Sequence, residues 1–65
     1  MDSEKIAVKL TCLRGEKSRE QGAKDLGISV SAVAMYETGA RIPRDEIKKK
    51  IATYYGVSVE AIFFE

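Results

Sequence analysis

Apolar residues near the start of the chain recur at the spacing of an α-helix. Ile6, Leu10 and Leu13 follow an i, i+4, i+7 pattern, which aligns them along one side of a helix. Ser3 is a suitable N-cap, and Gly15 is a typical helix stop. We therefore predict a helix from residue 3 or 4 to residue 14, with Val8 and Cys12 outside the main core.

Two short helices are predicted next, each bounded by a serine and a glycine. Ser18 and Ser29 can accept hydrogen bonds from free backbone N–H groups, and Gly27 and Gly39 can end the helices. The predicted ranges are 19–26 and 30–38. The three-residue connection is too short for antiparallel packing, so the second helix should leave at a large angle. The expected inner residues are Ala23, Leu26, Val33 and Tyr36.

A fourth helix is predicted from Pro43 to about Tyr55, because proline favours helix starts and the apolar spacing returns. Its stripe consists of Ile47, Ile51 and Tyr54, which leaves the lysines at residues 48–50 mostly outside. Gly56 ends this helix.

The last predicted helix is short and closes the core. Ser58 caps it, and it runs from residue 59 to about residue 64, with Val59, Ile62 and Phe63 facing inward. Five helices with short connections and no strand signal predict an all-α fold that fills residues 1–65 as one domain.

Composition and charge narrow the function classes. The 65 residues include no histidine, the most frequent general base, and no cluster with metal-ligand spacing or glycine-rich phosphate loop. We therefore expect no enzyme activity, cofactor, metal or small-molecule ligand. Cys12 cannot form an internal disulfide, and no apolar run approaches the roughly 20 residues of a membrane span. The first five residues lack a signal-peptide core, so a cytoplasmic location is expected.

Positive charge is concentrated in one stretch. The net charge is +1, but residues 41–50 carry five basic and two acidic side chains. Such a stretch can contact phosphates or can simply be a solvated helix face, and charge alone does not decide between them.

The spacing of Arg19, Ala23, Gly27, Val33 and Tyr36 carries the functional prediction. The small alanine allows the two helices to approach, and the glycine permits the sharp turn. The valine and the tyrosine pack the second helix against the rest of the domain. The opposite side of that helix is then free to enter a DNA major groove, which is wide enough for one helix.

Residues 18–39 resemble the phage-repressor (XRE-type, lambda-repressor-like) helix-turn-helix family. Residues 41–43 and 55–63 are similar to the same family. The resemblance implies a bacterial or phage-encoded five-helix domain that binds double-stranded operator DNA, commonly as a homodimer, and acts as a repressor-like transcriptional regulator.

The resemblance also assigns roles to individual positions. Base-reading positions fall on Val30, Ser31, Ala34 and Met35. Phosphate-contacting positions fall on Ser18, Arg19, Thr38, Arg41 and Arg44. Arg14 and Glu37 match a structural ion pair of the family.

Three departures from the family pattern affect these expectations. The connection at residues 15–17 is short, and Gly22 replaces a usual leucine or valine, at a cost of about 1 kcal/mol relative to alanine. The reading side also lacks Arg, Asn and Gln, which bind guanine or adenine best. We therefore expect phosphates and DNA shape to carry much of the affinity.

An alternative stays open at this stage. The apolar reading side and the exposed Val8 and Cys12 are also compatible with a protein-interaction module on the same fold, such as an antirepressor or a regulator's partner. Phe63 and Phe64 cannot easily both point inward, so one is expected in the core and the other in a dimer interface.

Overall fold

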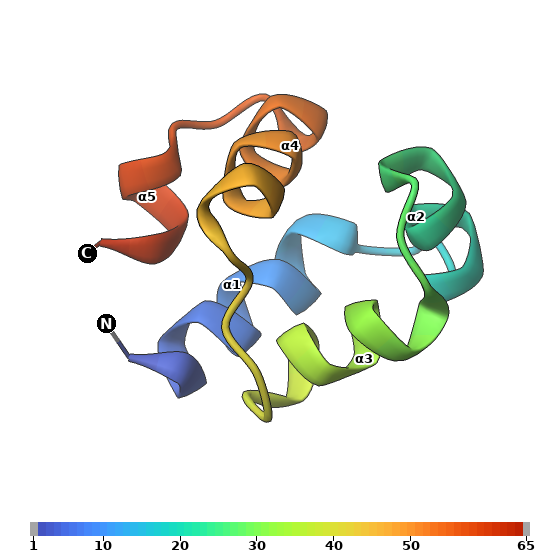
Figure 1. Ribbon diagram of the computed structural model, residues 1–65, viewed down its shortest axis with the longest axis horizontal. Coiled ribbons are helices and arrows are strands. Elements are labelled where there is room, and N and C mark those ends of the chain that lie inside the picture. The colour runs from blue at the N-terminus through green and yellow to red at the C-terminus, as the bar shows by residue number, and fades with distance from the viewer. Residues whose placement is uncertain (1, 65) are drawn as a thin grey trace.

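The computed structural model describes residues 2–64, which form five helices and no strand. The helices are α1 (Ser3–Arg14), α2 (Arg19–Leu26), α3 (Val30–Thr38), α4 (Asp45–Tyr55) and α5 (Val59–Phe63) (Figure 1). The predicted all-α architecture is confirmed, and the ranges of α2 and α3 are those expected from their caps. None of these helices is long and apolar enough to cross a membrane.

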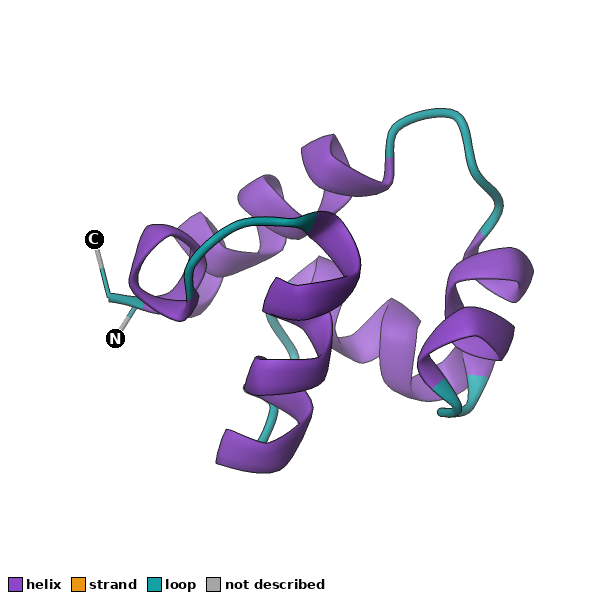
Figure 2. Cartoon of the chain, turned by 90° about the horizontal axis from the view of Figure 1, so that it is seen from above, coloured by secondary structure: helices purple, strands orange, loops and turns teal. Residues whose placement is uncertain are grey.

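The core lies where α1 meets the other helices. Ile6 and Leu10 of α1, Ile51 of α4, and Ile62 and Phe63 of α5 are each at most 3% exposed. Helix α1 packs against α3 and α5, while α4 contacts α5 and α2. The start of α1 and the end of α5 lie near each other in both views (Figures 1 and 2). The predicted inner residues of α2 and α3 are also buried: Ala23, Leu26, Val33 and Tyr36.

The turn between α2 and α3 sets the direction of α3. Gly27 adopts a left-handed conformation with φ of 71°, which side chains with a Cβ rarely adopt. The Ile28 N–H donates to the Ala23 carbonyl at 3.0 Å, which closes the end of α2. Ser29 then accepts from the Ala32 N–H at 3.0 Å and starts α3. Three residues thus connect the end of α2 to the start of α3, and α3 runs in a different direction from α2 (Figure 1).

The predicted range of α1 is confirmed, but its predicted cap and the predicted start of α4 were wrong. Asp2, not Ser3, caps α1, because its carboxylate accepts from the N–H groups of Glu4 and Lys5 at 2.9 and 3.2 Å. Helix α4 begins at Asp45, with Arg44 as its N-cap, two residues after Pro43. Pro43 is instead buried in the loop before α4, where its ring is part of the packed interior.

The prediction that Lys48 lies outside was also wrong. Lys48 is 7% exposed and belongs, with Ile51 and Ala52, to the buried side of α4. Its Nζ lies 3.4 Å from Asp45 Oδ1 and over the rings of Phe63 and Phe64, 5.7 and 5.3 Å from their centroids. The long aliphatic stem covers apolar surface while the ammonium keeps a carboxylate and two aromatic faces as partners.

Candidate nucleic-acid interface

Helix α3 presents one buried side and one accessible side. Its buried residues are Val33, Tyr36 and Glu37. On the other side, Val30 and Ser31 are exposed and Ala34 and Met35 are half-buried. Pairs four residues apart share a helix face, so these four positions form one surface, widest open at the N-terminal end of α3.

The loop after α3 is fastened to the end of that helix. The Met35 carbonyl accepts from the Arg41 N–H and from the Thr38 hydroxyl, each at 3.3 Å. Arg41 and Arg44 are exposed in this loop. Two guanidinium groups are therefore carried by a loop whose path is tied to the accessible side of α3.

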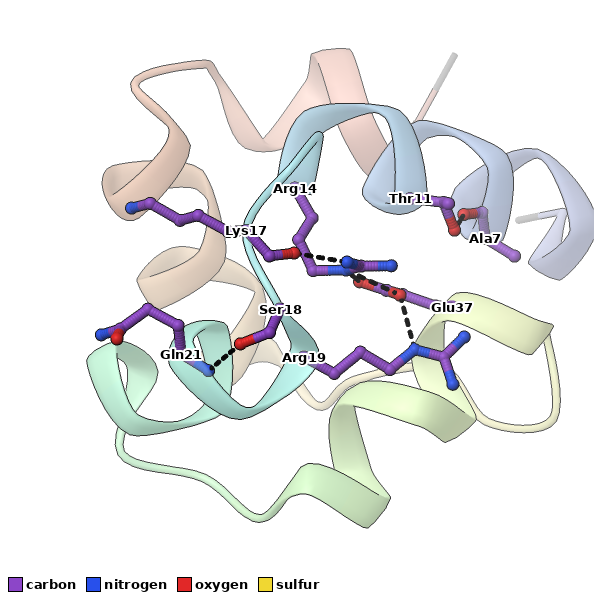
Figure 3. A network of polar contacts seen from close by, with 8 residues as sticks. All are labelled: Ala7, Thr11, Arg14, Lys17, Ser18, Arg19, Gln21 and Glu37. Carbon is purple, nitrogen blue, oxygen red and sulfur yellow. Dashed lines mark hydrogen bonds and ion pairs between the residues drawn. The ribbon is translucent and has the colours of Figure 1, made fainter.

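The start of α2 provides a second group of polar atoms. The exposed Ser18 caps this helix, with its Oγ accepting from the Gln21 N–H at 3.0 Å (Figure 3). The first N–H groups of a helix have no partner within the helix and favour an anion. Ser18 and Arg19 thus lie at an end of α2 that is electrostatically suited to a phosphate.

A buried carboxylate joins the first three helices. Glu37 of α3, whose side chain is 2% exposed, accepts from Arg14 Nε of α1 at 2.8 and 3.1 Å. It also accepts from Arg19 Nε of α2 at 3.1 Å (Figure 3). The hydrogen bond that the charged guanidinium donates to Glu37 raises the pKa of Arg14 and outweighs the opposing effect of burial. One carboxylate faces two guanidinium groups, so the cluster keeps a net positive charge.

The family follows from comparison with known proteins. A family model described as helix-turn-helix matches residues 12–62, which is most of the chain and includes all of α2 and α3. The chain belongs to the XRE, lambda-repressor-like helix-turn-helix family. This membership makes the protein a DNA-binding helix-turn-helix regulator in general terms. Neither curated proteins nor solved structures gave a match.

Within this helix-turn-helix, Arg19 has a contact that sequence reasoning missed. The resemblance assigned Arg19 to a phosphate and paired Glu37 with Arg14 alone. The structure adds the Arg19–Glu37 contact and leaves the Arg19 side chain 39% exposed, with its terminal nitrogens turned away from Glu37 (Figure 3). No sequence signal marks this contact, because the two residues are joined only through the geometry of the α2–α3 turn.

A second polar network fixes the helix-turn-helix to α4. The Tyr54 hydroxyl donates to Asp25 Oδ2 at 2.5 Å and accepts from Lys17 Nζ at 2.8 Å. Gln21 Nε2 donates to the other Asp25 oxygen at 2.8 Å. The hydrogen bonds from Tyr54 and Gln21, together with the charge of Lys17, hold the pKa of Asp25 below its ordinary value. This network holds α2 in place against α4.

In the part of the chain that the structure describes, no three side chains of His, Cys, Asp or Glu are grouped so that they could hold a metal ion.

Proposed function

We propose that this protein is a sequence-specific, duplex-DNA-binding transcriptional regulator of the phage-repressor type that inserts α3 (Val30–Thr38) into the major groove. The observation that carries the proposal is the exposure of Ser31, on the side of α3 opposite its buried residues, and of Val30 at the N-terminal end of the helix. A major groove admits one helix, and residues at the N-terminal end of that helix then reach the base edges.

The chemistry of the reading side sets the kind of specificity. Val30, Ala34 and Met35 can contact thymine methyl groups, and Ser31 can exchange hydrogen bonds with any base. None of them makes a bidentate contact with guanine or adenine. Discrimination per half-site is therefore modest, and DNA shape contributes to it.

Phosphate contacts supply most of the affinity in this proposal. The terminal nitrogens of Arg19 and the N-terminal N–H groups of α2 flank α3 on one side, and Arg41 and Arg44 follow it in the chain. Thr38 contributes only if its hydroxyl turns away from the Met35 carbonyl. Such contacts fix the position of the protein on the duplex without reading sequence.

A homodimer on a pseudo-palindromic operator completes the proposal, with half-sites about 34 Å apart, one helical turn. Phe63 is 2% exposed and belongs to the core, so only Phe64, which is 59% exposed, is left for a dimer interface. In this proposal the protein acts in the reducing cytoplasm of a bacterium. Its gene is of bacterial or phage origin.

One observation supports a second candidate function, a protein-interaction module. Val8 is 63% exposed beside an apolar groove of about 360 Å³ between α1 and α5. Cys12, Leu13, Val57 and Ile62 line the same groove. An apolar protein contact there would respond little to salt, whereas DNA binding through phosphates weakens steeply as salt is added.

The experiment is a selection of bound duplexes from a random-sequence pool, combined with sedimentation of the free protein. The proposal expects an enriched site with two related halves and an affinity that falls linearly with salt on a double-logarithmic scale. Absence of binding to any duplex in dilute buffer contradicts DNA binding. Enrichment of a single half-site contradicts only the dimer.

A further inference from the structure

A positively charged cleft lies between the C-terminal end of α2 and the exposed side of α4. It has a volume of about 590 Å³ and is open to solvent. Its lining consists of residues 24–27 together with Lys49, Lys50, Thr53 and Tyr54. None of these residues belongs to the accessible side of α3 or to the candidate phosphate positions.

Three ammonium groups of this cleft have no charged partner among residues 2–64. Lys24, Lys49 and Lys50 are exposed, and each makes neither an ion pair nor a side-chain hydrogen bond with the described residues. The carboxylate in the lining, Asp25, is already held by Tyr54 and Gln21, with Lys17 Nζ at 3.7 Å. The cleft therefore presents an uncompensated positive charge.

Most of the exposed lining of the cleft is apolar, although lysines stand along it. Leu26 and the ring of Tyr54 contribute apolar surface to it, as do the aliphatic stems of the lysines. A DNA duplex presents phosphates on a convex surface, and its apolar thymine methyl groups lie inside the major groove, where a concave cleft does not reach them. An extended peptide can place carboxylates against the lysine ammonium groups and one apolar side chain against the apolar lining.

We propose that this cleft binds a short acidic segment of a partner protein, with its carboxylates on Lys24, Lys49 and Lys50 and an apolar side chain against Leu26 and Tyr54. Charge complementarity is the argument for this occupant. Because α3 takes no part in the cleft, the protein binds duplex DNA and the acidic segment at the same time. The site is independent of the DNA-binding role and adds a contact with another protein to it.

The test is an NMR titration of the ¹⁵N-labelled full chain with a synthetic peptide of glutamates around one central leucine. Amide shifts at residues 24–27 and 49–54 are expected to change and saturate, with and without bound duplex, and affinity should fall as salt rises. A peptide with lysine in place of glutamate should not bind. A peptide with serine in place of the leucine should bind more weakly.

Reversing the charge of cleft lysines makes the test of peptide affinity quantitative. The double variant Lys49→Glu/Lys50→Glu should bind the acidic peptide about tenfold more weakly, since it replaces two attractive contacts by repulsive ones. Lys5→Glu changes an exposed lysine on α1 and should bind as the unchanged protein does. It is the control for the single variant Lys49→Glu, because each of these two variants changes the net charge by two. Lys49→Ala/Lys50→Ala, checked by its helical circular dichroism, replaces the double reversal if the latter does not fold.

Three results would overturn the proposal. Shifts confined to α3 and its following loop would mean that the peptide only imitates DNA. Equal weakening by Lys5→Glu and by the single variant Lys49→Glu would mean general charge attraction. A duplex that shifts the cleft amides and loses affinity in the double variant but not in Lys5→Glu would make the cleft a DNA-binding surface instead.

Discussion

Arg19 donates its Nε–H to Glu37 at 3.1 Å, and this contact fixes the start of α2 to the buried side of α3. Arg14 holds the same carboxylate from α1 at 2.8 Å. The terminal nitrogens of Arg19 are thereby oriented by the helix that carries the reading side (Figure 3). In the proposed complex, the position of the phosphate contact at Arg19 is therefore fixed relative to the base contacts of α3.

Arg19→Ala tests the phosphate role. We expect weaker binding to every duplex by a similar factor, and a slope of log affinity against log salt reduced by about one, because one phosphate contact is lost. Glu37 keeps Arg14 as a partner, so the fold should persist. Fluorescence anisotropy with two unrelated duplexes at several salt concentrations measures both quantities, with Lys5→Ala as the control. Unchanged nonspecific affinity would show that the docking geometry is wrong.

Ser31→Ala tests direct base reading. Ser31 is exposed, so removal of its hydroxyl should leave stability within about 0.5 kcal/mol. The expected effect is a changed preference among duplex sequences, with little change in nonspecific affinity. Met35→Ala should also alter preference, but Met35 is half-buried, so its thermal stability must be compared alongside. Unchanged enriched sequences in both variants would place the reading surface elsewhere.

Gly22→Ala should stabilise the protein. Gly22 lies inside α2, and a Cβ there would meet only Arg14 Cδ, at an ordinary contact distance of 3.9 Å. Alanine favours helix by about 1 kcal/mol over glycine, which corresponds to a rise in Tm of roughly 4–8 °C for a domain of this size.

Gly27→Ala is the matched control for that substitution. A Cβ at Gly27 would meet nothing within 4 Å, but the φ of 71° disfavours alanine, so Tm should fall. Thermal unfolding followed by circular dichroism measures both variants. A fall in Tm for Gly22→Ala would mean that the added methyl group disturbs Arg14 and its bond to Glu37.

Lys48→Ala should destabilise the fold, whereas its neighbour Lys49→Ala should not. Lys48 loses packing of its stem and the contact of its ammonium with two phenylalanine rings, about 1–2 kcal/mol together. Lys49 is exposed, and its truncation should change stability by less than about 0.5 kcal/mol. Urea unfolding of the two variants makes the comparison. Equal midpoints would contradict a packing role for Lys48.

Local signals made much of the fold predictable. Ser18, Ser29 and Ser58 cap the helices for which they were expected, because capping depends on neighbouring backbone atoms alone. The burial of Lys48 was not predictable in this way, because the aromatic rings that receive it lie at the end of α5 and directly after it. The side-chain polarity of lysine suggested the wrong face.

The candidate site was predictable to a different degree. The resemblance assigned α3 positions by register, and the structure brings them onto one side of the helix. The ion pair between Glu37 and Arg19 was not predictable, because it depends on the direction that the three turn residues give to α3. The cleft between α2 and α4 depends on how two helices distant in the sequence pack, which no local pattern encodes.

The central claim is that the Val30, Ser31 and Met35 side of α3 contacts duplex DNA. An NMR titration of the ¹⁵N-labelled protein with duplex DNA in dilute buffer tests it most directly. The account predicts the largest amide shift changes at the N-terminal half of α3 and at the start of α2, with α5 little affected. Absence of binding, or shifts that leave α3 unchanged, would contradict it.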